Sequence, residues 1–187
     1  MKKSIIAIVV AVVVIAVIII GAVFIFSKNK EEKTTTQTGV KIQTAQEMEK
    51  IMNDINTKLE GALPAIETRT IDISDEYAFT STTGLKSNEN VEAVVVSEPF
   101  ISSQAHSAVM IKAKENANIE EMKQEILNNI DMRKWICVSA EKLWVTNYND
   151  IIFFVMSSEE WGKPVYDEFK QAVGGTVGKE LEKTEEF

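Results

Sequence analysis

The chain has 187 residues, with 28 acidic and 20 basic side chains and a formal net charge of −8. Five of the basic residues and only two of the acidic ones lie in the first 33 positions, so the remainder carries a net charge of −11. A surface this acidic repels phosphate backbones, which argues against nucleic acid as a partner. The single cysteine, Cys137, excludes an internal disulfide, and its place in the apolar run WICV predicts a buried side chain.

An uncharged apolar run from Ile5 to Phe26 stands near the start of the chain. A helix of this length, at ~1.5 Å per residue, crosses the roughly 30 Å hydrocarbon core of a bilayer. The run is longer than the apolar region of a cleaved signal peptide and does not end in small residues of the A-x-A type. We therefore expect residues 1–26 to form an uncleaved signal anchor that spans the cell membrane once through residues 5–26.

Lysines flank the apolar run on both sides, but its short basic N-terminal flank is typical of a signal anchor whose C-terminal domain is exported. Residues 27–43 are polar, rich in threonine and without periodicity, which predicts a flexible stalk. Residues 44–175 have the patterns of a folded domain, and residues 176–187 are expected to form a frayed acidic tail. The sequence thus predicts an extracytoplasmic domain held at the cell membrane.

Three amphipathic helices are predicted in the folded domain. The first, 44–61, opens with the Thr-x-x-Glu spacing of a capping box, and a glycine ends it. The second, 118–131, opens with an asparagine cap and has an apolar residue every three or four positions. The third is expected from about residue 163 to residue 174, after a loose turn, because Pro164 fits a helix only in its first turn.

Short alternating or β-branched segments predict the strands of a sheet. They are 69–80, which includes an acidic turn, and 91–96, 107–113, 135–139, 143–147 and 151–156. The last two are separated by Tyr148-Asn149-Asp150, a turn composition that predicts an antiparallel hairpin. Because each helix has one apolar stripe, the expected fold class is α+β, a mainly antiparallel sheet of four to six strands with about three helices on one face.

No residue pattern indicates catalysis, a metal or a cofactor. His106 is the only histidine, which excludes a multi-histidine zinc site from one chain, and no G-x-S-x-G elbow presents a serine. Ser139 and Lys142 match an S-x-x-K pattern without its companion motifs, and the acidic run 72–76 lacks the ligand order of an EF-hand. Carboxylate pairs of the glycosidase type would leave no motif visible in one sequence, so they stay open.

Basic charge meets an aromatic ring at Arg133, Lys134 and Trp135 in this otherwise acidic domain. A guanidinium beside an indole can hold a carboxylate, which predicts a binding site there. The loop before the strand 107–113 offers hydroxyl, amide and imidazole groups, and its candidate residues are Ser102, Ser103, Gln104 and His106. The two loops form one site if they share one end of the sheet. They do not if the strands that follow them are paired and antiparallel.

The run from Gln104-Ala-His-Ser through the helix 118–130, then Arg133-Lys-Trp-Ile-Cys-Val and the strand 151–156, resembles a domain of unknown function. That domain is found in membrane-anchored and lipoprotein-type surface proteins of Gram-positive bacteria. The resemblance covers about residues 45–175 and implies an extracytoplasmic α+β domain without implying a mechanism. The chain lacks the acylated cysteine of the lipoprotein members, which leaves the apolar helix as its anchor.

Two functions from different classes are compatible with these patterns. The first is a binding or scaffolding module at the bacterial cell envelope, with an envelope protein or a small carboxylate-bearing ligand as its partner. The alternative is a small hydrolase that acts on envelope material through carboxylates. The absence of any recognisable pairing of a nucleophile with a base favours the binding module.

Overall fold

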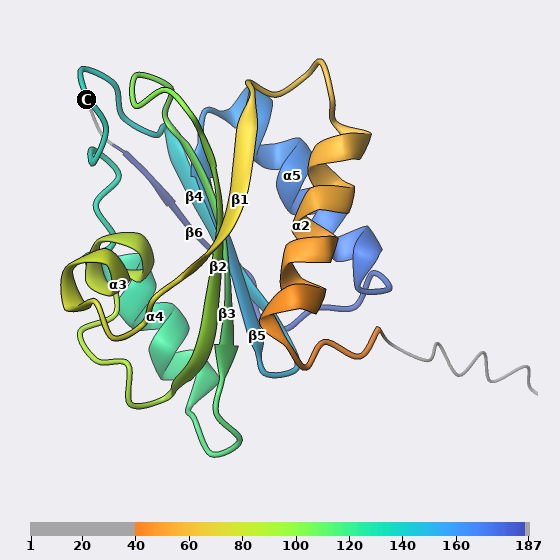
Figure 1. Ribbon diagram of the computed structural model, residues 1–187, viewed down its shortest axis with the longest axis vertical. Helices are drawn as coiled ribbons and strands as arrows, with labels where there is room; N and C mark the ends of the chain where they lie inside the picture. Colours follow the sequence, from red (N-terminus) through yellow and green to blue (C-terminus); the bar gives the residue numbers. More distant parts are fainter. Residues whose placement is uncertain (1–39, 186–187) are drawn as a thin grey trace, which may run out of the picture. The chain divides into compact units, whose positions relative to one another are not determined.

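The computed structural model describes residues 40–185, which fold around a six-stranded antiparallel sheet in the order β1-β2-β3-β5-β4-β6 (Figure 1). The strands are β1 (Ile66–Ile71), β2 (Val91–Pro99), β3 (His106–Ala113), β4 (Lys142–Tyr148), β5 (Ile151–Ser157) and β6 (Leu181–Thr184). The helices are α2 (Ala45–Lys58), α3 (Glu76–Thr83), α4 (Ile119–Asn129) and α5 (Glu159–Ala172). The predicted α+β class and the antiparallel sheet are confirmed.

Helices cover both faces of the sheet, two on each face (Figure 1). Successive residues of a strand point to opposite faces. In β3, Val109 and Ile111 pack with α3 and α4, whereas Ala108 and Met110 pack with α2 and α5. The prediction that the helices lie on one face is therefore wrong. Strands such as β5, apolar at nearly every position, need cover on both sides.

Local signals explain the helix ends that the sequence analysis identified. Thr44 and Glu47 form the predicted capping box, in which the Glu47 amide donates to the Thr44 hydroxyl at 3.2 Å and the Thr44 amide to the Glu47 carboxylate at 3.0 Å. Asn118 caps α4 by accepting from the Glu121 amide through its side-chain oxygen. The hairpin between β4 and β5 is also confirmed, and Asn149 takes the positive φ that such a turn requires.

The segment predicted as the strand 69–80 is divided between β1 and α3. Asp75 caps α3 by accepting from the Ala78 amide at 3.0 Å. Acidic side chains at this end also stabilise the helix, because they interact favourably with the positive end of its dipole. Gly84 ends the helix with a φ of 73°, and a Cβ at this position would lie 2.9 Å from the backbone nitrogen of Ile130. The acidic cluster therefore starts a helix and does not form a turn between strands.

The C-terminal segment predicted as a frayed tail is ordered in the described range. β6 pairs with β4, and the Gly178 amide donates to the Asn147 carbonyl at 2.7 Å. The ammonium of the fully buried Lys123 bonds to the Lys179 carbonyl and the Asn147 side chain, both at 2.8 Å, and to the carboxylate of Glu120 at 2.6 Å. Lys123 thus connects α4 and β4 to the segment that leads into β6.

Replacing Lys123 by methionine is expected to lower the free energy of unfolding by about 1–3 kcal/mol, because it removes the donor from two partly buried oxygen acceptors. Chemical denaturation measures the change. The matched control is Lys179→Met, since the side chain at position 179 is exposed and only its carbonyl takes part. Equal stabilities for the two variants would contradict the role given to Lys123.

None of the helices within residues 40–185 combines the length and the hydropathy of a membrane span. The predicted anchor, residues 1–26, lies outside the described residues, as does the predicted stalk up to residue 39. Of the remaining stalk residues, Ile42 is buried in the core beneath α2 and α5.

Candidate binding site at the loop end of the sheet

Two loops meet at one end of the sheet. The loop between β2 and β3 contacts the segment 130–141, which leads from α4 to β4, and the Ile136 amide donates to the Ser102 carbonyl at 3.1 Å. The predicted strand 135–139 is wrong, because this stretch forms no sheet ladder and crosses the end of the sheet. The loops predicted to carry the site therefore lie together without the parallel strand pair that the sequence required for it.

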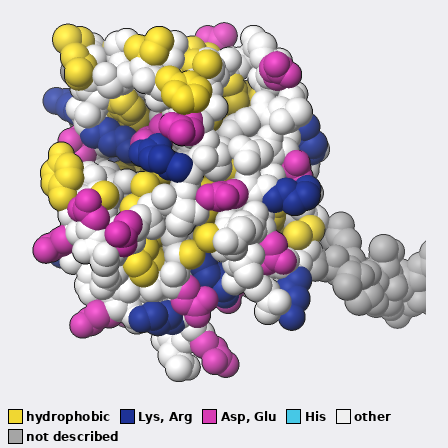
Figure 2. All heavy atoms as spheres, in the orientation of Figure 1, with side chains coloured by type: hydrophobic (Ala, Val, Ile, Leu, Met, Phe, Trp, Pro, Cys, Tyr) yellow, Lys and Arg dark blue, Asp and Glu magenta, His cyan; other side chains and the backbone are white. Residues whose placement is uncertain are grey.

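Exposed hydrophobic side chains project from both loops, and we call this group the apolar tip. It consists of Phe100, Ile101, Ile136 and Val138, which are 68%, 59%, 65% and 36% exposed. Figure 2 shows hydrophobic side chains gathered at the end of the molecule where these loops lie. Because water hydrates such surface poorly, four large apolar side chains held together at the surface are typical of a docking site.

Cys137 lies in the middle of the apolar tip and is exposed, so the prediction that it is buried is wrong. The alternation of WICV is that of a strand, but the backbone at Cys137 has a φ of 61°, which breaks the extended conformation. Trp135 packs against the core beside α3 and α4, while Ile136 points outward. An open hollow of about 500 Å³ remains between Arg133, Trp135 and residues 137–139.

The cations of the predicted site already hold carboxylates of the chain itself. Arg133 pairs with Glu185, just beyond β6. The Lys134 ammonium lies 2.6 Å from the carboxylate of Glu98 and 5.3 Å from the ring centroid of Trp135. The two ion pairs fasten the segment 130–141 to strands that are distant in the sequence, and they place charged groups around the apolar tip.

Glu98 is the centre of a half-buried polar cluster at the end of β2. Besides Lys134, its carboxylate accepts from Arg69 of β1 at 3.0 Å and from the Ser107 hydroxyl at 2.9 Å. Burial alone would raise the pKa of Glu98, but the charge of Lys134 and the hydrogen bonds from the three donors outweigh it and hold the pKa below its usual value. The carboxylate is therefore ionised at neutral pH and anchors the loop segment.

His106 is the first residue of β3 and is fully buried. The Ser157 hydroxyl donates to the Ala105 carbonyl at 3.2 Å, which leaves its oxygen to accept from His106 Nδ1 at 3.0 Å. Burial lowers the pKa of His106 to about 4, partly opposed by the charge of Glu98. The imidazole is thus neutral at pH 7 and lies inside the domain, away from the surface of the predicted site.

The other predicted residues of this loop are more accessible. Ser102 and Ser103 are exposed, and Gln104 is half-buried. Ser102 takes part in the loop contact through its backbone carbonyl, so its hydroxyl is not needed to hold the two loops together. The structure therefore places two of the predicted polar side chains beside the apolar tip and His106 beneath the surface.

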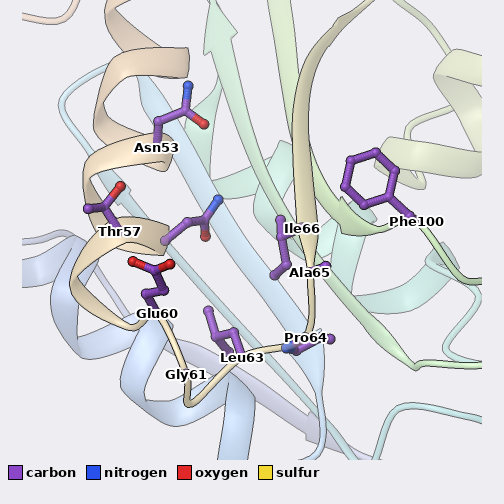
Figure 3. Close-up of a pocket in the computed structure, with 10 residues that line it drawn as sticks. Asn53, Thr57, Glu60, Gly61, Leu63, Pro64, Ala65, Ile66 and Phe100 are labelled. Carbon is purple, nitrogen blue, oxygen red and sulfur yellow. The ribbon is translucent and has the colours of Figure 1, made fainter.

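The described residues hold no metal-ligand cluster, and the groove between α2 and β1 holds no carboxylate pair. Within residues 40–185, no three His, Cys, Asp or Glu side chains lie close enough to hold a metal ion. A groove of about 510 Å³ lies between α2 and β1, lined by Asn53, Thr57 and Glu60 from the helix side (Figure 3). Glu60 is the only carboxylate in its lining, whereas glycoside hydrolysis requires a pair.

The apolar tip is the part of the site that the sequence analysis missed. Phe100 and Ile101 follow Pro99 directly, and a pair of large apolar residues after a strand-ending proline is a signal that could have identified them. Ile136 and Val138 gave no such signal, since they read as strand residues. No protein-family model, curated protein or solved structure matches the chain.

Proposed function

We propose that the chain is a non-catalytic binding or scaffolding module of the bacterial cell envelope, and that its partner docks on the apolar tip. The observation that carries the proposal is the exposure of Phe100, Ile101 and Ile136 on two loops that a backbone hydrogen bond holds together. Residues 5–26 anchor the protein in the cell membrane, and the folded domain is extracytoplasmic, as in the Gram-positive surface proteins that the sequence resembles.

The surroundings of the tip favour an envelope protein over a small carboxylate-bearing ligand as the partner. A small carboxylate would have to displace Glu185 from Arg133 or Glu98 from Lys134. A protein surface needs no such exchange, because it can cover the apolar centre and leave the ion pairs at the rim. An apolar centre with a polar rim is the usual composition of protein–protein interfaces.

The position of the tip within the domain supports the same proposal. The C-terminal end of α2 lies near Phe100, since Glu60 and Phe100 line one groove. The described chain enters at residue 40, before the N-terminal end of α2, which lies at the other end of the helix (Figure 1). A stalk joined at residue 40 therefore starts away from the tip.

Photo-crosslinking from the tip tests the proposal in intact cells. A benzophenone amino acid at position 100 of the full chain is expected to give a discrete adduct with a second protein, because Phe100 lies in the docking surface. The matched control is the same probe at position 77, since Tyr77 is 84% exposed on α3, outside the tip. Equal labelling from both positions, or none from position 100, would contradict the proposal.

In the same cells, Ile136→Ser is expected to reduce the adduct formed from position 100 by roughly 10- to 100-fold, which corresponds to about 1.5–3 kcal/mol for a buried aliphatic side chain. The fold should be unaffected, because Ile136 is 65% exposed. Densitometry of the adduct, normalised to the amount of full chain in the membrane fraction, measures the effect. An undiminished adduct would show that the tip is not the docking surface.

A further inference from the structure

β1 is an edge strand whose second side is unpaired in the described part of the chain. It lies at the end of the sheet order and pairs with no strand other than β2. In Figure 1 it runs along the near edge of the sheet, between α2 on one face and α3 on the other. An edge strand of six residues presents backbone donors and acceptors that a further strand can pair with.

The backbone groups that face the open side of β1 follow from its pairing with β2. The Phe100 amide donates to the Ala65 carbonyl, so residue 65 bonds toward β2. Because hydrogen bonding alternates along an antiparallel strand, residues 67, 69 and 71 also bond toward β2, and the groups of Ile66, Thr68 and Thr70 face outward. An added antiparallel strand must therefore pair through residues 66, 68 and 70.

The side chains of β1 alternate between the two faces of the sheet. Thr68 and Thr70 point toward α2, where they bond to Asn56 and Glu49. Glu67 and Arg69 point to the other face, where Arg69 reaches Glu98 across the strand pair. One face of this edge thus carries an acidic and a basic residue separated by a single position.

Glu67 stands in an unfavourable place within the domain. It lies directly opposite Glu98 in the register of β1 and β2, and like charges at such positions destabilise a strand pair. Arg69 and Lys134 both bind the carboxylate of Glu98. Among residues 40–185, no hydrogen bond or ion pair involves the carboxylate of Glu67. A cation placed on the open side of β1 would therefore be attracted to Glu67.

The charges on β1 are complementary to those of a second copy of the same strand. In an antiparallel pair of two β1 strands centred on Thr68, Glu67 of each copy lies opposite Arg69 of the other. Shifting the centre by one residue would place Glu67 against Glu67, or Arg69 against Arg69, so charge selects the register centred on Thr68. The same register pairs Ile66 with Thr70 and Thr68 with Thr68. The outward-facing backbone groups of each copy then lie opposite outward-facing backbone groups of the other.

We propose that two copies of the chain associate through β1, joining their sheets across a two-fold axis at Thr68. Such an interface is closed, because each copy uses the same edge, whereas pairing β1 with β6 of another copy would continue into fibres. On the α2 face, Figure 3 shows Asn53, which is uncharged and does not repel a second copy, directed from the helix toward the β1 side of the groove.

Charge exchange tests the proposal on the full chain in detergent micelles, with sedimentation equilibrium as the measurement. The wild type is expected to dimerise. Glu67→Arg and Arg69→Glu, each alone, place two pairs of like charges in the interface and should raise the dissociation constant roughly tenfold. Mixing the two variants puts every Arg opposite a Glu, so heterodimers should form with an affinity close to that of the wild type.

The two variants also control for folding. Arg69→Glu removes a bond to Glu98, but Glu67→Arg breaks no ion pair of the domain, and circular dichroism checks both. Recovery of association in the mixture supports the β1 interface and its register. A monomeric wild type, unchanged association of either variant alone, or a mixture no tighter than its components overturns the proposal. So does capture of a foreign peptide on the β1 edge by a wild-type monomer.

Discussion

Lowering the pH from 7 to 4 is expected to reduce the free energy of unfolding by about 3 kcal/mol through His106 alone. The imidazole is fully buried, and burial holds its pKa at about 4 in the folded domain, against 6.5 for an unperturbed histidine. In the unfolded chain the imidazole is in water and takes up a proton near pH 6.5. Between these values only the unfolded state binds the proton, and protonation therefore favours unfolding.

The sign and the window of the effect follow from the two pKa values. The contribution of His106 is complete above pH 6.5, is lost progressively as the pH falls from 6.5 to 4, and does not change further below 4. Glu98 acts at lower pH, because its pKa lies below its usual value, so its contribution is lost only as the pH falls from that usual value toward the folded pKa. The interval from pH 4.5 to 7 therefore isolates the histidine.

Denaturant titrations of the wild type and of His106→Gln at several pH values measure the effect. The comparison uses the slope of the free energy of unfolding against pH, so any loss of stability from the substitution itself does not matter. The wild-type curve should fall toward pH 4.5, and the variant curve should lack most of that fall. Parallel curves would contradict the buried, neutral state of His106.

Features determined by neighbouring residues could be predicted from the sequence. The capping box of Thr44 and Glu47 identified the start of α2, and the composition of residues 148–150 identified the hairpin between β4 and β5. These signals act within a few residues and do not depend on the rest of the fold. The beginning of α5 was placed too late, because Ser158 caps the helix and Pro164 is accommodated inside it.

Features that depend on contacts between distant residues could not be predicted. The sequence of β6 is polar and predicted a frayed tail. These residues form a strand because they pair with the edge of β4. The stretch 135–139 has the pattern of a strand. However, Lys134 forms an ion pair with Glu98, 36 positions earlier, and the segment crosses the end of the sheet. For the same reason the sequence identified the loops of the candidate site but not its apolar tip.

The second large effect is expected at the centre of the sheet, where Phe153→Ala should lower the free energy of unfolding by about 3–5 kcal/mol. The Phe153 side chain on β5 is fully buried and stacks on Phe169 of α5, with ring centroids 4.0 Å apart, while Tyr166 lies 6.2 Å away on the same helix. Truncation removes these contacts and leaves a cavity that the strands on either side of β5 cannot close.

Phe100→Ala is the matched control for this prediction, because it makes the same chemical change at a side chain that is 68% exposed. Its effect on the free energy of unfolding should stay within about 0.5 kcal/mol, as for other surface substitutions. Denaturant titration of the two variants at pH 7 compares the loss of stability at the buried and at the exposed phenylalanine. A large loss of stability for Phe100→Ala would mean that the tip belongs to the core, and it would remove the physical basis for assigning Phe100 to binding. If only Phe153→Ala lowers the free energy of unfolding, the fold depends on the core of the sheet and not on the apolar tip. The tip is then available to bind a partner.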